Sequence, residues 1–255
     1  VHEATHLVVD VTGWFTGEPV AATTAAPVNT PPADRKVTII TDSAIAGVRW
    51  NGALASLQGF VVDHRMESCR RLVLASCSGR EGYRPRNVVA ELATLSAGPE
   101  DVVVIATGYD DWWERFSSDF DTVVSAARAR GFHHIVWVTY RTDVSYHGLG
   151  AYYAVMNGVL REKEASGEFP DVRLWDFAGY TAAASGWFTS DGIHLTELGS
   201  FGAGDWISRQ VRAFDGRPCA QPWAPGRPVD DPCPDPDPLP PARGLPDIAN
   251  LYAVG

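Results

Sequence analysis

The sequence contains little sulfur and no long apolar stretch. Only 4 of its 255 residues are cysteine and 2 are methionine. No two cysteines are spaced as Cys-x-x-Cys, so the usual zinc and dithiol redox motifs are excluded. The longest apolar runs, such as Val102 to Ala106, are far shorter than the ~20 residues that a membrane-spanning helix needs. We therefore predict no transmembrane segment in this chain.

Positive charge is also scarce. The chain has 21 Lys and Arg residues against 31 Asp and Glu residues, which gives a formal net charge of −10. Proteins that bind nucleic acid use cationic side chains to displace counterions from phosphates, so this charge argues against a nucleic-acid partner. The composition, with 45% hydrophobic and 20% charged residues, is typical of a globular protein.

Several common catalytic signatures are missing. There is no G-x-S-x-G sequence, which argues against an ordinary α/β-hydrolase lipase, and no G-x-G-x-x-G or Walker loop for nucleotide phosphates. His2 to His6 does spell the zinc-protease pattern H-E-x-x-H, but that pattern needs a helix, and a β-like run follows it directly. We interpret the match as chance and predict neither a metal nor a cofactor.

The cysteines, although few, indicate an oxidising compartment. Four cysteines allow three pairings, and an even number of them together with few methionines fits a secreted protein. We predict disulfides between Cys69 and Cys77 and between Cys219 and Cys233; the alternative is four buried free thiols. No signal peptide is visible, but the chain begins at Val1 without Met, so we expect a processed fragment whose leader lay upstream.

Composition divides the chain into four segments. Residues 1–17 contain one strand-like alternation, HLVVDVTGWF, which cannot fold alone and is interpreted as the remnant of a preceding β segment. Residues 18–34 are rich in Ala, Thr and Pro and are expected to form an extended linker. Residues 35–214 form the predicted catalytic domain. Residues 215–255 are a Pro- and Asp-rich tail, in which proline disfavours helices and central strands.

Within the predicted domain, five short β-branched runs alternate with five stretches of helical spacing. The predicted strands are residues 37–41, 60–63, 101–107, 134–140 and 172–177. The predicted helices are residues 45–57, 86–95, 117–130, 150–165 and 196–214. This alternation predicts a flavodoxin-like three-layer α/β/α sandwich around a five-stranded parallel sheet. Ligands of such sheets bind beyond the carboxyl ends of the strands, so the residues that follow each strand are the candidate site.

Reactive side chains lie in three such places. Ser43 follows the first predicted strand at a helix N-terminus, where a nucleophile is exposed and electrostatically favoured, although Ser43 or Asp42 is equally suited to cap the helix. Gly108 to Asp111 follow the third strand, where a plain turn also explains the acids. Asp191 and His194 precede the last helix; the carboxylate can orient the imidazole, or simply cap the helix beside a surface histidine. Taken together, the segments predict a Ser-His-Asp hydrolase.

These segments resemble the signature blocks of the SGNH (GDSL) hydrolases. Thr41-Asp42-Ser43 with Gly47 resembles the Gly-Asp-Ser-x-x-x-Gly block, with Thr41 in place of the first Gly, a change we expect to affect only local packing. Gly108 to Asp111 resembles the Gly-x-Asn-Asp block, and Asp191 to His194 the Asp-x-x-His block. The resemblance covers about residues 36–214. It implies that the serine is the nucleophile, the histidine the base, and the aspartate the acid that orients the histidine.

The resemblance also implies an oxyanion hole formed by the Ser43 N–H, a second-block glycine and the third-block Asn. The second block falls within residues 78–82, where Gly79 and Gly82 are both candidates and the spacing to the next helix favours Gly82. Asp110 replaces the Asn. An ionised carboxylate there would repel the oxyanion, and losing one donor costs about 10² to 10³ in turnover. Burial beside a second carboxyl could instead keep Asp110 protonated.

We predict that Asp42, Tyr109 and Trp112 contact the substrate. Further aromatic residues fall near the predicted strand ends, where they either line an acyl or sugar pocket or pack in the core: Trp113, Tyr140, Tyr152, Tyr153, Trp187 and Phe188.

Residues 102–141 resemble the secreted or cell-wall SGNH domains of actinobacteria, some of which are joined to membrane acyltransferases. The resemblance implies a secreted serine esterase that acts on an O-acyl ester, in particular an O-acetyl ester, of a carbohydrate or cell-wall glycolipid, in association with the cell envelope. Two alternatives stay open. The same triad supports an O-acyltransferase, and Asp110 favours a catalytically impaired cell-wall or carbohydrate-binding module.

Overall fold

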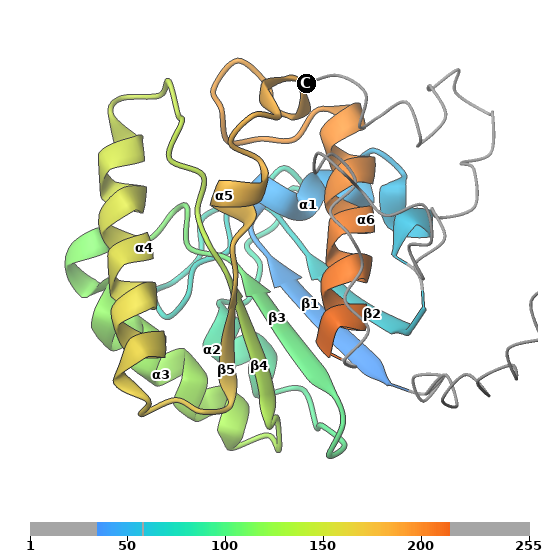
Figure 1. The fold of residues 1–255 in the computed structure, drawn as a ribbon, viewed down its shortest axis with the longest axis vertical. Coiled ribbons are helices and arrows are strands. Elements are labelled where there is room, and N and C mark those ends of the chain that lie inside the picture. The colour runs from blue at the N-terminus through green and yellow to red at the C-terminus, as the bar shows by residue number, and fades with distance from the viewer. Residues whose placement is uncertain (1–34, 58, 215–255) are drawn as a thin grey trace, which may run out of the picture. The chain divides into compact units, whose positions relative to one another are not determined.

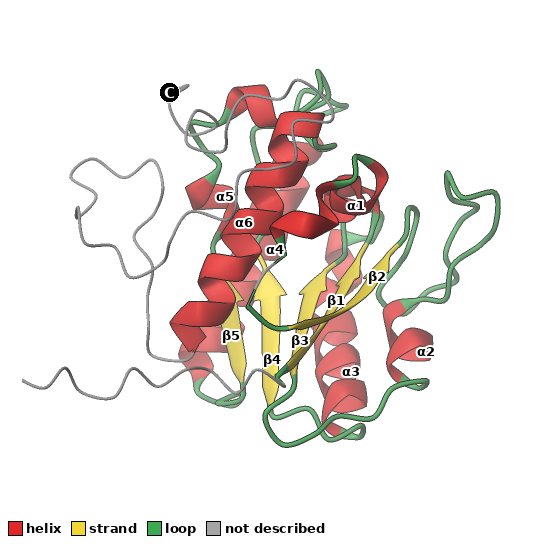
Figure 2. Ribbon diagram, turned by 90° about the vertical axis from the view of Figure 1, so that its right-hand side faces the viewer, coloured by secondary structure: helices red, strands yellow, loops and turns green. Residues whose placement is uncertain are grey.

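A computed structural model of the chain describes residues 35–57 and 59–214, which form a three-layer α/β/α sandwich (Figures 1 and 2). The fold class predicted from the sequence is therefore confirmed. The predicted strand remnant, linker and tail, together with Cys219 and Cys233, lie outside the described residues.

Five parallel strands form the central sheet in the order β2-β1-β3-β4-β5. They are β1 (Lys36–Thr41), β2 (Val61–Met66), β3 (Val102–Ala106), β4 (His134–Val138) and β5 (Val172–Trp175). The central strands are buried on both faces, which explains their continuous apolar sequences. From β1 the chain continues to β2 on one side and later to β3 on the other. The carboxyl ends of β1 and β3 thus form the switch point at which such sheets bind ligands.

Helices cover both faces of the sheet. On one face α1 (Ser43–Trp50) packs against α6 (Glu197–Phe214) (Figure 1). The other face carries α2 (Val88–Leu92), α3 (Phe116–Arg128) and α4 (Leu149–Ser166). A short α5 (Phe177–Tyr180) and three 3₁₀ turns, at Ala53–Ser56, Trp113–Arg115 and Ser185–Trp187, connect the longer elements. Among the helices of the described ranges, none is both long and apolar enough to cross a bilayer.

Of the element ends that differ from the sequence prediction, three have a clear local cause. The second strand reaches Met66 instead of residue 63, because an edge strand keeps one side in solvent and tolerates polar residues there. The fifth strand ends at Trp175, because the Asp176 side chain accepts the Gly179 N–H at 3.1 Å and starts α5. The first helix stops at Trp50, because Gly52 takes a left-handed φ of 73° and a 3₁₀ turn follows.

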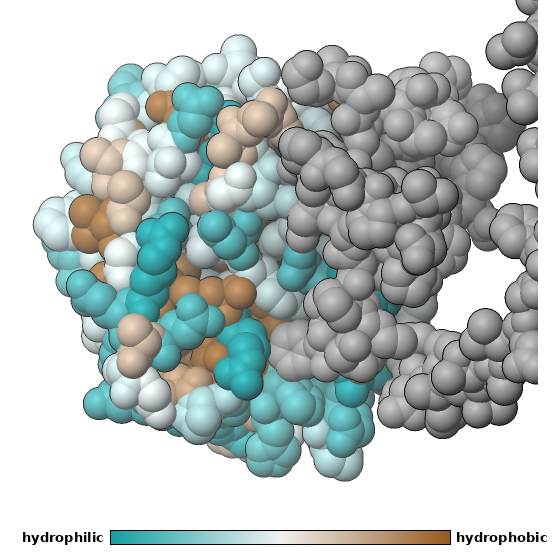
Figure 3. All heavy atoms as spheres, in the orientation of Figure 1, coloured by the Kyte–Doolittle hydropathy of each residue, from teal (hydrophilic) through white to brown (hydrophobic). Residues whose placement is uncertain are grey.

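An aromatic cluster fills the layer between the sheet and α3. The ring of Phe116 meets Trp137 and Tyr140 edge to face, with centroids 5.8 and 5.6 Å apart. The buried polar atoms are satisfied, since Trp137 Nε1 donates to the Tyr140 hydroxyl at 3.0 Å and that hydroxyl donates to Thr107 O at 2.8 Å. On the face drawn in Figure 3, hydrophobic residues appear only in small separate groups. Among the described residues, most large hydrophobic side chains are buried.

Two glycines provide a matched test of this packing. A Cβ added at Gly47, where α1 meets α6, would lie 2.8 Å from Ser200 Oγ and 3.1 Å from Leu195 Cβ. Gly47→Ala is expected to lower the free energy of unfolding by about 1 to 3 kcal/mol. Gly158, within α4, has no atom within 4 Å of such a Cβ, and Gly158→Ala should raise it by up to about 1 kcal/mol. Urea unfolding followed by circular dichroism measures both, and equal effects would contradict the close packing of α1 on α6.

Candidate active site

Ser43 is the first residue of α1, directly beyond the carboxyl end of β1. Asp42 caps this helix with an extended backbone, and its Oδ1 accepts the Ala44 N–H at 3.0 Å. The first N–H groups of a helix have no intrahelical acceptor, and the described residues offer none to the Ser43 N–H. Both the hydroxyl and the amide of Ser43 are thus available at the positive end of the helix.

The structure brings Ser43, His194 and Asp191 together. His194 Nε2 lies 3.0 Å from Ser43 Oγ, and His194 Nδ1 lies 2.6 Å from Asp191 Oδ2. With its proton on Nδ1, where the carboxylate accepts it, the imidazole keeps a lone pair on Nε2 that faces the hydroxyl. In this arrangement an imidazole can take the hydroxyl proton while the oxygen attacks an electrophile.

The Asp191 carboxylate is fixed by its own loop. Oδ1 accepts hydrogen bonds from the amides of Ile193 at 2.8 Å and His194 at 3.0 Å, and from the Thr189 hydroxyl at 2.8 Å. Partial burial raises the pKa of Asp191, but these bonds and the His194 ring outweigh it and lower that pKa to about 2. The carboxylate therefore stays ionised beside the imidazole across the neutral range.

We predicted that Asp42 contacts the substrate, and this prediction is wrong, because the Asp42 side chain is fully buried. Its Oδ2 accepts the amides of Gly108 at 2.8 Å and Tyr109 at 2.9 Å. Burial, with the nearby charge of Asp110, raises the pKa of Asp42 to about 7, against the opposing effect of its amide hydrogen bonds. Asp42 thus ties the turn after β1, which carries the serine, to the turn after β3.

The other two predicted substrate contacts also lie outside the cavity at the triad. The Tyr109 ring packs against Tyr140 and Tyr153, with centroids 5.2 and 4.7 Å apart, and its hydroxyl accepts the Arg141 N–H at 2.7 Å. Trp112 is 58% exposed on the surface. Tyr109 is therefore a packing residue, while Trp112 remains free to meet a ligand outside the cavity.

A cavity of about 470 Å³ opens beside the triad, a size typical of small-molecule sites. Ser43 and His194 line it together with residues from α1, from the stretch after β2, from the turn after β3 and from the His194 loop: Gly47, Trp50, Asn51, Ser68, Cys69, Ser78, Gly79, Arg80, Asp110, Thr189 and Leu195.

Asp110 lies beside a disulfide at the wall of this cavity. A carboxylate oxygen of Asp110 and the sulfurs of Cys69 and Cys77 lie within 4.8 Å of one another. The two cysteines form the predicted disulfide, with Cα atoms 5.3 Å apart, so in this form they offer no thiolate to a metal. Burial raises the pKa of Asp110, while the charges of Arg71 and His194 lower it. Asp110 therefore holds its proton to higher pH than an exposed aspartate does.

The glycines of the predicted second block use their amides within their own loop. The Gly79 N–H donates to Tyr83 O at 2.9 Å, and the Gly82 N–H donates to Gly79 O at 3.1 Å. Gly79 lines the cavity, whereas Gly82, with a φ of 84°, forms part of a local turn outside it. The predicted role of Gly82 as an oxyanion donor does not fit this geometry.

The turn directly after β2 carries no signature in the sequence. Met66 of β2 pairs in parallel with Thr41 of β1. Two residues beyond this pair, the segment after β2 reaches Ser68 and the segment after β1 reaches Ser43. Ser68 and the next residue, Cys69, both line the cavity. The predicted strand ended three residues too early, because Asp63 to Arg65 are polar and show neither the apolar run nor the alternation that marks a strand in sequence.

The aromatic residues predicted near the strand ends divide between core and surface. Tyr140, Tyr153, Trp187 and Phe188 are buried, as the packing alternative predicts. Three of the others are exposed, as is Tyr146, which was not predicted, and we call these four residues the aromatic surface: Trp112, Trp113, Tyr146 and Tyr152. They come from the turn after β3, the loop after β4 and the start of α4, and two of them stack, with Trp113 and Tyr152 centroids 6.2 Å apart. The loop that carries Tyr146 also contacts the triad loop, since the Ser145 N–H donates to Asp191 O at 3.1 Å.

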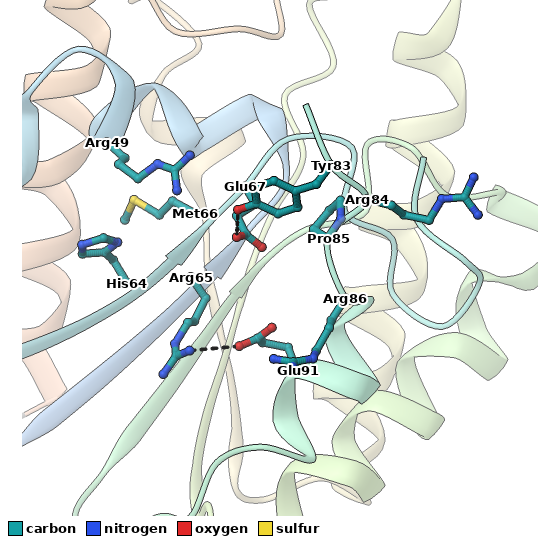
Figure 4. A pocket seen from close by; sticks show the side chains of 10 residues that line it. All are labelled: Arg49, His64, Arg65, Met66, Glu67, Tyr83, Arg84, Pro85, Arg86 and Glu91. Atoms are coloured by element: carbon teal, nitrogen blue, oxygen red, sulfur yellow. Dashed lines mark hydrogen bonds and ion pairs between the residues drawn. The ribbon is translucent and has the colours of Figure 1, made fainter. Parts of the chain in front are cut away.

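A second cavity, of about 420 Å³, lies beside the edge strand β2 (Figure 4). Four arginines and two glutamates are among its lining residues: Arg49, His64, Arg65, Met66, Glu67, Tyr83, Arg84, Pro85, Arg86 and Glu91. Both carboxylates already have partners in the wall, since Glu91 pairs with Arg65 at 3.2 Å and Glu67 accepts the Tyr83 hydroxyl (Figure 4). The triad residues do not line this cavity, so we place the reactive chemistry in the first one.

Comparison with known proteins gives matches among solved structures only, since no protein-family model and no curated protein matches the chain. A member of the lipolytic protein G-D-S-L family from Veillonella parvula DSM 2008 is similar over 70% of this chain and 98% of its own, with 12% identity and a TM-score of 0.51.

Two further structures are similar with TM-scores just below 0.5. The catalytic domain of the peptidoglycan O-acetyltransferase OatA from Streptococcus pneumoniae covers 73% of this chain and 97% of its own, at 18% identity and a TM-score of 0.49. The carbohydrate acetylesterase Est24 from Sinorhizobium meliloti covers 71% and 99%, at 18% identity and a TM-score of 0.48. At these identities the similarity concerns the fold alone. The described part of the chain therefore has the fold of the SGNH (GDSL) hydrolases, as its sequence blocks predicted.

Proposed function

We propose that this protein is a serine esterase of SGNH type. The observation that carries the proposal is the continuous set of contacts from Ser43 Oγ to His194 Nε2, at 3.0 Å, and from His194 Nδ1 to Asp191 Oδ2, at 2.6 Å. These contacts lie at the wall of a cavity of about 470 Å³ at the switch point of the sheet. A nucleophile, a base and an acid that orients the base are the parts required for acyl transfer.

In the proposed reaction, Ser43 Oγ attacks the ester carbonyl carbon while His194 Nε2 takes the hydroxyl proton. Asp191 stabilises the imidazolium that forms. The oxyanion is stabilised by the Ser43 N–H at the start of α1. When the tetrahedral intermediate collapses, the alcohol leaves with the proton from His194. Water then attacks the acyl-serine by the same route, and the carboxylic acid leaves.

We further propose that the alcohol part of the substrate is a carbohydrate or a cell-envelope glycolipid, carrying an O-acetyl or longer acyl group. The stacked, exposed pair Trp113 and Tyr152 supports this, because exposed aromatic side chains in contact mark a contact surface, and flat rings with polar edges suit sugar rings. The disulfide between Cys69 and Cys77 supports a secreted, envelope-associated protein.

An O-acyltransferase remains the second candidate, because an acceptor hydroxyl can replace water in the second half of the reaction. Hydrolysis of p-nitrophenyl acetate with and without an added sugar acceptor separates the two. An esterase releases acetate at the same rate in both assays, whereas a transferase forms acetylated sugar at the expense of acetate. An impaired binding module would neither hydrolyse the ester nor react at Ser43.

Removal of the triad side chains tests the proposed chemistry. Ser43→Ala is expected to lower kcat for p-nitrophenyl acetate by at least about 10⁴-fold and to abolish labelling by a fluorophosphonate. Asp191→Asn should lower kcat by about 10⁴-fold, because the imidazole loses the acceptor that fixes its tautomer. Ser118→Ala, at an exposed serine of α3, is the control and should match the wild type. Labelling that persists in Ser43→Ala would overturn the proposal.

The pH dependence of Asp110→Asn tests the carboxyl in the Asn position. As pH rises through the raised pKa of Asp110, the wild type loses a donor and gains a charge that repels the oxyanion. An asparagine keeps its N–H donor at every pH. The ratio of variant kcat to wild-type kcat should therefore exceed one near neutral pH and rise toward about 10² at alkaline pH. Glu114→Gln, at an exposed carboxylate near the same turn, should give a flat ratio. A flat or falling ratio for Asp110→Asn would contradict this account.

Truncation of the aromatic surface tests the carbohydrate proposal. In a Trp113→Ala, Tyr152→Ala variant, kcat/KM for an O-acetylated oligosaccharide is expected to fall by about 10-fold or more, because the sugar loses its contact with two rings. The rate with p-nitrophenyl acetate, which is too small to reach both the serine and this surface, should stay unchanged. Val61→Ala removes an exposed apolar side chain from β2 and serves as the control. Equal losses with both substrates would indicate a folding defect and contradict the proposal.

A further inference from the structure

The second oxyanion donor, which neither glycine of the predicted block supplies, has a candidate in the turn after β2. Of the cavity-lining residues in this region, Ser68 donates its amide to the Glu81 carboxylate at 3.2 Å, and Gly79 donates its amide to Tyr83 O at 2.9 Å. The Cys69 N–H, by contrast, finds no acceptor within the part of the chain that the structure describes. The Ser78 N–H finds none there either, but only Cys69 lies in the turn directly after β2, the strand that pairs with β1 and so with the segment leading to Ser43. A main-chain N–H left open beside a nucleophile is the kind of group that stabilises an oxyanion.

The backbone of Cys69 is held in an unusual conformation. Its φ is 63°, and His147 is the only other non-glycine residue of the described ranges with a positive φ. A side chain with a Cβ disfavours this left-handed region, so such a residue persists only where its surroundings enforce it, and it often marks a functional site.

Two hydrogen bonds place this turn between the loops of the active site. The fully buried Arg70 donates from Nε to Thr41 O at 3.2 Å, two residues before Ser43. On the other side, the Leu72 N–H donates to Asp111 Oδ2 at 3.0 Å, next to Asp110. Cys69 is therefore fixed between the strand end that carries the nucleophile and the turn that carries Asp110.

The disulfide completes the restraint on Cys69. Its Sγ is bonded to Cys77, and its carbonyl oxygen accepts the Cys77 N–H at 3.2 Å. The side chain and the carbonyl of Cys69 are thus both engaged on the Cys77 side of the turn. Of the polar groups of Cys69, only the N–H is left for a ligand in the cavity.

We infer that the Cys69 main-chain N–H is the second oxyanion donor, beside the Ser43 N–H, and that the Cys69–Cys77 disulfide positions it. This inference rests on the proposed function, because the donor acts only on the intermediate formed at Ser43. It follows that a glycine at residue 69, which takes a positive φ without strain, replaces the disulfide, whereas a β-branched residue does not.

Two double variants that both lack the disulfide test this inference. Cys69→Gly with Cys77→Ala should keep kcat for p-nitrophenyl acetate within about threefold of the wild type, because glycine favours the left-handed turn. Cys69→Val with Cys77→Ala should lower kcat by about 10²-fold. KM should change little in either variant, because the donor binds the oxyanion and not the ground-state ester. Thermal unfolding of both variants shows whether the fold is kept.

If the valine variant does not fold, reduction of the disulfide provides the same comparison. In a Cys219→Ala, Cys233→Ala background, a reductant should lower kcat with KM unchanged, and reoxidation should restore it. Equal kcat values in the glycine and valine variants, or a kcat unaffected by reduction, would overturn the inference. A wild type without Ser43-dependent hydrolysis would overturn the proposed function as well, whereas an active wild type with equal variants would overturn this inference alone.

Discussion

The buried carboxyl of Asp42 is the constraint on which the geometry of the site depends. It accepts the amides of Ala44, Gly108 and Tyr109 at 2.8 to 3.0 Å, so one side chain starts α1 and also fixes the turn after β3. Without it, the two turns at the switch point would have buried amides and no acceptor. Burial, together with the nearby charge of Asp110, raises the pKa of Asp42 to about 7 despite these three hydrogen bonds.

The carboxyls around the nucleophile fall into two electrostatic classes. Asp191, bonded to the imidazole and to its own loop, has a pKa lowered to about 2. Asp42, Asp110 and Asp111, near the ends of β1 and β3, have pKa values raised by burial. Charge is therefore kept beside His194, where an imidazolium forms, and is reduced on the side of Ser43 where an oxyanion forms. Separating titratable groups in this way assigns each of them a different role in one reaction.

The sequence predicts the features that are encoded by the type of side chain at each position, namely the buried strands and the three reactive residues. Continuous apolar runs identify the buried strands, and Ser43, Asp191 and His194 lie in short local patterns whose residue types name their roles. The sequence offered Asp42 as a helix cap, which it is, but its hydrogen bonds to Gly108 and Tyr109 were missed, because they join segments that are far apart in the sequence. The turn at Cys69 was missed for a different reason, because a main-chain N–H leaves no mark on residue type.

A residue at a strand end can adopt a left-handed backbone conformation for two reasons. Glycine adopts the conformation freely but is also free to leave it, whereas a residue with a Cβ must be forced into it. At Cys69 the restraint is provided by the disulfide and by Arg70, whose guanidinium is fully buried and hydrogen-bonded to Thr41 O. A donor held in this way needs little reorganisation when the oxyanion forms, and preorganisation is what makes such donors effective. The disulfide thus holds residue 69 in the left-handed conformation, whereas a glycine at this position would only allow that conformation.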